Sequence, residues 1–323
     1  MSQSSRPGVA ELVERARGGD PRSVARLISL VEDASPSLRE AMAALTPYGG
    51  NATVIGITGA PGVGKSTSTN ALVAAFRARD LRVGVLAVDP SSPFSGGALL
   101  GDRVRMQDHA TDSGVYIRSM ASRGHLGGLA WSTPQALRVL DAAGCDVILV
   151  ETVGVGQSEV EVAGLADTTV VLLAPGMGDA IQAAKAGILE VGDVYVVNKA
   201  DRDGADSAVR ELRHMLTLGE RRHPGDWRPP ILRTVASRGE GLEDLVDALD
   251  KHRGWLEETG NLAVRRRRRA VDEIEAIALT SLRERMGDLR AGQRLEDLAD
   301  RVVAGELDPY AAADVLIAGV TDS

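Results

Sequence analysis

A glycine-rich stretch close to residue 60 constrains the fold of this chain more than any other feature. It reads GAPGVGKS and fits the pattern Gly-x-x-x-x-Gly-Lys-Ser/Thr of a phosphate-binding loop. A β-branched run over 53–58 precedes it and a helical pattern over 67–79 follows it, the order that places a phosphate at a helix N-terminus. Lys65 would reach the β- and γ-phosphates, and the Ser66 hydroxyl would hold Mg²⁺. The stretch predicts a nucleoside triphosphate site formed by Gly59, Ala60, Pro61, Gly62, Val63, Gly64, Lys65, Ser66 and Thr67.

Composition limits the classes of protein open to a chain of 323 residues. Hydrophobic residues make up 44% and charged residues 25%, as in globular proteins with a substantial core. The net charge of −8 and an aromatic content of 3% argue against a nucleic-acid-binding surface. Residues 1–20 contain no apolar signal-peptide core, and no apolar run approaches membrane-spanning length. We therefore expect a cytoplasmic protein whose partners include neither nucleic acid nor a membrane.

Apolar spacing divides the chain into three parts. Residues 7–46 repeat apolar side chains at helical intervals. The middle alternates short apolar strands with helices, which predicts an α/β P-loop fold with a doubly wound, mostly parallel sheet. From about Gly241 helical patterns return, with breaks near Gly287, Gly292 and Gly305. We predict an N-terminal helical segment (1–48), a P-loop nucleotide domain (49–252) and a C-terminal helical arm (253–323).

Acidic residues follow two of the predicted strands. Asp89 ends the strand over 81–88, and the polar loop after it carries Asp102, which is either part of a nucleotide-ordered switch or a simple turn aspartate. The most apolar strand ends on Glu151, and Glu151-Thr-Val-Gly154 stands where GTPases usually carry Asp-x-x-Gly. The acid would hold Mg²⁺ through water or position the attacking water, while the Gly154 amide would contact the γ-phosphate.

The residue after this glycine bears on the rate of hydrolysis. Ras-like GTPases place a water-orienting glutamine there, and this chain has Val155. Because valine cannot orient water, we predict slow intrinsic turnover unless Gln157 or a partner supplies the missing group.

A second nucleotide motif follows the strand over 194–197. Asn198, Lys199 and Asp201 match Asn-Lys-x-Asp, in which the aspartate accepts hydrogen bonds from guanine N1–H and the exocyclic amine. Adenine lacks this donor pattern, so the buried acid would discriminate against it. The later stretch TVASRGEG resembles the fifth GTPase motif, which closes over the base with Ser237, Arg238 and Gly239.

Two polar clusters allow more than one interpretation. Asp179, Gln182 and Lys185 are spaced three apart, and their residue types alone favour a solvated helix face. The run Arg265–Arg269 could bind nucleic acid or acidic lipid, but its acidic surroundings favour a solvated face with pairing within the chain or between subunits.

The motifs together resemble the MeaB/ArgK family of P-loop GTPases, which includes the human cobalamin protein MMAA. The segments that carry the resemblance are GAPGVGKST, VDPSSPFSGGALLGDRVRM, RSMASRGHLGGLA, VETVGVGQSE, APGMGDAIQAAKAGI, NKAD and DPYAAADVL. The resemblance implies a chaperone of methylmalonyl-CoA mutase that binds and hydrolyses GTP, gates the delivery of adenosylcobalamin, and protects or reactivates the mutase.

The same resemblance assigns roles to residues that their own types left open. It implies that Asp89, Asp102 and Glu151 join Ser66 as direct or water-mediated Mg²⁺ positions. It makes Asp179, Gln182 and Lys185 a third switch that touches the mutase, in place of a solvated helix face. It also implies that the C-terminal helices form the dimerisation arm of a homodimer.

Three other functions are compatible with parts of this sequence. The chain could be a non-catalytic scaffold in which GTP only sets the conformation. A GTPase for metal or cofactor insertion is disfavoured because no histidine-rich or paired-cysteine relay appears. Some relatives carry an older name as an amino-acid transport ATPase or kinase, but the Asn-Lys-x-Asp motif argues against ATP.

Overall fold

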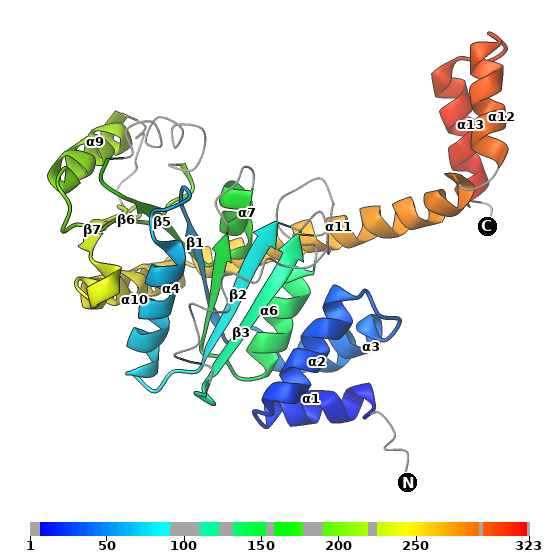
Figure 1. Ribbon diagram of the computed structural model, residues 1–323. Coiled ribbons are helices and arrows are strands. Elements are labelled where there is room, and N and C mark those ends of the chain that lie inside the picture. The colour runs from blue at the N-terminus through cyan, green and yellow to red at the C-terminus, as the bar shows by residue number, and fades with distance from the viewer. Residues whose placement is uncertain are drawn as a thin grey trace. The chain divides into compact units, whose positions relative to one another are not determined.

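The computed structural model describes residues 7–90, 109, 111–122, 132–152, 158–176, 190–218, 225–290 and 293–321 (Figure 1). Several residues singled out above lie outside these ranges, so their predicted roles stay predictions: Asp102, Gly154, Val155, Gln157, Asp179, Gln182 and Lys185.

The described strands form one seven-stranded sheet in the order β3-β2-β4-β1-β5-β6-β7. Every pair of neighbouring strands is parallel, so the carboxyl ends meet at one edge, as the arrows of Figure 1 show. The strands are β1 (Thr53–Thr58), β2 (Val83–Pro90), β3 (Val115–Ser122), β4 (Val147–Thr152), β5 (Thr168–Leu173), β6 (Val194–Asn198) and β7 (Ile231–Thr234).

Helices cover both faces of this sheet. They are α4 (Lys65–Arg77), α6 (Thr133–Ala142), α7 (Ser158–Leu165), α9 (Ala205–Leu218), α10 (Leu242–Glu258) and the short 3₁₀ helix η4 (Ala236–Arg238). Alternate residues of β1 enter different cores: Ile55 and Ile57 pack with α4 and α10, whereas Val54 packs with α6. Parallel strands covered on both faces are continuous apolar runs, as β4 and β5 are here. The doubly wound α/β prediction is confirmed.

The N-terminal helices pack on the α6 side of the sheet. They are α1 (Val9–Arg17), α2 (Pro21–Glu32) and α3 (Leu38–Leu45), followed by the 3₁₀ helix η1 (Thr46–Tyr48). Asp20 caps α2, since its side chain accepts a hydrogen bond from the Arg22 amide, and Pro21 occupies the first helical position. Leu27 and Ile28 of α2 join the core formed by α6 and the sheet. Arg118 of β3 donates to the Glu32 carboxylate at 3.0 Å and ties the sheet to α2.

The described chain divides into two compact units, residues 1–266 and 267–323. The helix α11 (Asn261–Arg290) begins in the first unit, and α12 (Gln293–Val303) and α13 (Pro309–Thr321) lie in the second. The break expected near Gly287 is wrong, because α11 continues through it to Arg290. One interior glycine costs a helix only about 1 kcal/mol, which a long helix can absorb. No helix in the described part of the chain has the length and apolar character needed to cross a membrane.

Candidate functional site

The glycine-rich loop joins the carboxyl end of β1 to the first turn of α4. Gly59 has φ +142°, and a Cβ there would collide with the carbonyl oxygen of Leu172. Gly64 has φ +96°, and a Cβ there would collide with the Asn198 amide nitrogen. Glycine is therefore required at both positions. The loop delivers the chain to α4 so that the free amides of its first turn face the carboxyl edge of the sheet.

Lys65, the first residue of α4, lies inside this loop. Its Nζ donates to the carbonyl oxygens of Gly59 at 2.6 Å and Ala60 at 3.1 Å, and the residue is buried. The positive charge therefore lies at the loop and beside the helix N-terminus, where both would attract phosphate oxygens.

Ser66 and Glu151 meet across the sheet edge. The Ser66 hydroxyl donates a 2.6 Å hydrogen bond to Glu151 Oε1, and the two residues are only 8% and 3% exposed. A hydroxyl and a carboxylate side by side are the oxygen donors that Mg²⁺ prefers, so this pair fits the ion. Asp89 lies one residue beyond Val88, which is aligned with Thr152, so its backbone is at the same edge as Glu151. No cluster of three or more metal-ligating side chains occurs among the residues for which the structure gives placements.

Asn198 connects the glycine-rich loop to the loop after β7. Its amide nitrogen donates to the Val63 carbonyl at 2.9 Å. Its amide oxygen accepts from the Ala236 amide and the Thr234 hydroxyl, both at 3.1 Å. The side chain is thus fully used in cross-linking two loops, and the residue is 2% exposed. Lys199 adds a further link, because its Nζ donates to the Gly62 carbonyl at 2.6 Å.

Asp201 follows this link, and its carboxylate lies 3.2 Å from Arg238 at the end of η4. The sequence placed both residues at the base, but it gave no signal that they pair with each other. The pair depends on β6 lying beside β7, which brings the two loops together.

An open groove of about 830 Å³ runs between α4 and α10 beside this site. Thr67 lies at its α4 wall, and Ser237 and Gly239 line it from the loop after β7. Residues of the glycine-rich motif and of the fifth GTPase motif therefore line the same groove.

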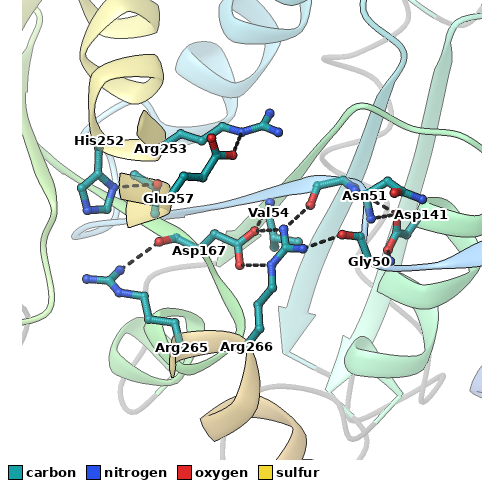
Figure 2. Close-up of polar contacts among 12 residues, drawn as sticks. Gly50, Asn51, Val54, Asp141, Asp167, His252, Arg253, Glu257, Arg265 and Arg266 are labelled. Carbon is teal, nitrogen blue, oxygen red and sulfur yellow. Dashed lines mark hydrogen bonds and ion pairs between the residues drawn. The ribbon is translucent and has the colours of Figure 1, made fainter. Parts of the chain in front are cut away.

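A second polar cluster lies at the amino edge of the sheet, the edge opposite to the glycine-rich loop. The Arg265 guanidinium binds both carboxylate oxygens of Asp193 at 2.8 Å. Arg266 binds the Asp167 carboxylate at 2.9 and 3.3 Å and also donates to backbone carbonyls of Gly50 and Ala52 (Figure 2). The pairing expected within the chain for the arginine run is present at these two positions. Both arginines are partly buried, so they are structural anchors and not a free basic patch.

His252 lies beside this cluster and is fully buried. Its Nδ1 is 2.8 Å from the Thr168 hydroxyl, and its Nε2 is 3.4 Å from Asp193. Burial lowers the pKa of His252 to about 4, against the opposing effect of the Asp193 charge. The hydrogen bonds that Arg265 donates to Asp193 raise the pKa of Arg265, which stays charged. With no exposed face, the Thr–His–Asp arrangement has no route to a substrate and is part of the core.

The parallel sheet, the glycine-rich loop and the Asn-Lys-x-Asp loop bound to it define a P-loop GTPase. Within this class, the family model described as "Methylmalonyl Co-A mutase-associated GTPase MeaB" matches residues 24–290. The chain belongs to this family, and it is a GTP hydrolase that takes GTP and yields GDP.

Two named relatives and one solved structure are similar to this chain over most of its length. A protein from Pyrococcus abyssi, named only as a GTPase, is 48% identical over 96% of this chain and 96% of its own. The mouse protein "Methylmalonic aciduria type A homolog, mitochondrial" is 36% identical over 81% of this chain and 64% of its own. A crystal structure of a "LAO/AO transport system kinase" covers 99% of this chain and 100% of its own, with a TM-score of 0.73 and 28% identity.

Proposed function

We propose that this GTPase serves an adenosylcobalamin-dependent methylmalonyl-CoA mutase as a chaperone in the cytoplasm. It would gate delivery of adenosylcobalamin to the mutase and protect or reactivate the enzyme. The description of the matching family and the name of the mouse relative support the choice of client.

The observation that carries the nucleotide chemistry is the double attachment of Asn198. By holding the Val63 carbonyl and the Ala236 amide together, it places the base-reading Asp201 at a fixed distance from the glycine-rich loop. A guanine nucleotide would then lie with its phosphates at Lys65 and its base at Asp201, with the backbone of Ser237, Arg238 and Gly239 closing over the base.

Hydrolysis needs charge neutralised on the phosphoryl group and a positioned water. Lys65 and the first-turn amides of α4 would neutralise the charge, and Glu151 would position the water. Ser66 and Glu151 would hold Mg²⁺, with Asp89 and Asp102 as further direct or water-mediated ligands, and the ion would supply positive charge to the phosphates. The Gly154 amide would contact the γ-phosphate. Val155 cannot orient water, so turnover by the protein alone would be slow.

Contact with the mutase is assigned to the third switch, Asp179, Gln182 and Lys185. Dimerisation is assigned to the C-terminal helices, and the exposed apolar side chains of α11 support it. Val271 is 54% exposed, Ile274 67% and Leu282 50%, and their spacing of three and eight residues places them on one helical face. An exposed apolar stripe of this kind is typical of an interface between helices.

The experiment is steady-state GTP turnover by the purified protein, alone and with methylmalonyl-CoA mutase from the same organism. A slow basal rate that rises when mutase is added is the expected result. A basal rate that mutase does not change would exclude this client while leaving the GTPase assignment intact. Light scattering in the same buffer would test the homodimer, since a monomeric mass at all concentrations contradicts it.

A further inference from the structure

The guanidinium of Arg238 lies against the carboxylate proposed to read the guanine base. Arg238 Nη2 is 3.2 Å from Asp201 Oδ2, and the two side chains are 60% and 34% exposed. The fold imposes this approach, because Asn198 at the end of β6 is aligned with Thr234 at the end of β7. The Ala200 amide also donates to the Thr234 carbonyl at 3.0 Å, which holds the two loops side by side.

Guanine and arginine present the same recognition group. The edge of guanine that an aspartate reads is N1–H together with the amine on C2, which is a guanidine built into a ring. Arg238 offers the same planar pair of N–H donors with a full positive charge, the geometry that binds a carboxylate best. Arg238 Nη2 lies on Asp201 Oδ2, one of the two oxygens that the guanine edge would use, so base and arginine compete for this oxygen.

We propose that Arg238 is an internal competitor of guanine for Asp201, so that it sets the affinity and association rate of guanine nucleotides. The inference rests on the proposed base-reading role of Asp201. Glu240 is the second acidic partner of Arg238, because its Oε1 is 3.8 Å from Arg238 Nη1. As the base docks, the guanidinium gives up Asp201 and keeps Glu240, so the arginine charge does not lose every partner.

The exposure of Arg238 and Asp201 determines how strongly Arg238 changes the affinity for nucleotide. Ion pairs between exposed side chains are weak and screened by salt, so removing Arg238 changes the nucleotide dissociation constant by about two- to fivefold. R238A should bind GDP more tightly by this factor and associate faster. The difference from the unmodified protein should shrink as the salt concentration rises. R238K keeps the charge but loses the planar donor pair, so its affinity should fall between the two.

The experiment is stopped-flow and equilibrium binding of a fluorescent methylanthraniloyl-GDP to the full chain and its variants. R233A is the matched control, because Arg233 is a neighbouring exposed arginine that pairs with Asp206 instead of Asp201. Tighter and faster binding by R238A, with R233A unchanged, supports the competitor. Equal binding by R238A overturns it, and weaker binding shows that Arg238 contacts the bound nucleotide instead.

A further variant separates this inference from the assignment on which it rests. D201N should shift the preference from GDP toward xanthosine diphosphate, because an amide presents a donor to the carbonyl on C2. If D201N leaves that preference unaltered, Asp201 does not read the base and the proposed function fails at this residue. If D201N shifts the preference but R238A binds GDP as the unmodified protein does, only the role of Arg238 fails.

Discussion

The Ser66 hydroxyl is 2.6 Å from Glu151 Oε1, although 84 residues separate the two in the chain. The contact exists because β1, which leads into the glycine-rich loop, pairs directly with β4, with Ile57 aligned with Glu151. The hydroxyl proposed to bind Mg²⁺ and the proposed catalytic acid are therefore positioned by adjacent strands of one sheet. Little relative movement is open to them, because both are buried.

Replacing Glu151 tests whether hydrolysis depends on this acid. E151A should lower kcat for GTP by about 100-fold or more, since a positioned acid or base contributes at least that much to hydrolysis. GTP binding should persist, because Lys65 and the loop amides remain. E211A, which removes an exposed acid of α9, should keep the turnover of the unmodified protein. Unchanged turnover in E151A would instead favour a nucleotide-dependent scaffold.

Removing the Asn198 side chain should affect both stability and nucleotide binding. N198A leaves the buried Ala236 amide and Val63 carbonyl without their partner, which costs about 2–4 kcal/mol of unfolding free energy. The base loop would also lose its attachment to the phosphate loop, so GDP affinity should fall. Urea unfolding and GDP titration measure the two effects. N51A, at an exposed asparagine, should change neither, and an N198A protein as stable as the original would contradict the cross-link.

The sequence predicts the parts of the site that are formed by residues close together in the chain. The stretch 53–79 contains the strand, the turn glycines and the helix, so the loop and α4 follow from local pattern alone. The apolar runs of β4 and β5 likewise predict buried parallel strands. Strand ends that depend on a neighbouring strand are harder to predict: β3 continues to Ser122 because each of its residues is aligned with one of β2.

Contacts that depend on strand order could not be predicted. Arg238 reaches Asp201 only because β7 is the neighbour of β6, and no local pattern encodes that order. Asp167 and Asp193, which precede β5 and β6, belong to no sequence motif. Their carboxylates accept backbone hydrogen bonds from Val54 and Thr169, each on the adjacent strand. The sequence predicted pairing for the arginine run but could not identify these two partners, because they are far away in sequence.

The Arg266–Asp167 ion pair should contribute more to the free energy of unfolding than an exposed ion pair does. Asp167 is 3% exposed, and R266A removes the charge that balances it together with donors to Gly50 and Ala52 (Figure 2). Breaking a buried pair from one side costs about 3 kcal/mol. R253A breaks the exposed pair with Glu257 and should cost less than about 1 kcal/mol. Urea unfolding compares the two, and equal losses would show that burial of Asp167 has no energetic effect.

His252 should make the stability of the protein depend on pH in the acid range. The pKa of its ring is about 4 in the folded chain, because burial disfavours the charged form, against a normal value of 6.5. The unfolded chain therefore binds a proton that the folded chain does not, so unfolding free energy falls as the pH drops from 6.5 toward 4. A separation of this size corresponds to roughly 3 kcal/mol at the acid end. Above pH 6.5 both forms are neutral and the contribution is complete.

Urea unfolding at pH 7 and pH 5 measures this loss, and H252Q should reduce it because glutamine does not titrate. H214Q is the control, because it removes an exposed histidine of α9 and leaves the buried ring in place. The fluorescence of Trp227 and Trp255 gives a local signal, because their rings lie 4.7 and 5.7 Å from the His252 ring. If H252Q loses as much stability between pH 7 and pH 5 as the unmodified protein, the acid sensitivity has another origin. If H252Q flattens the dependence, the buried ring at the amino edge of the sheet limits stability in acid.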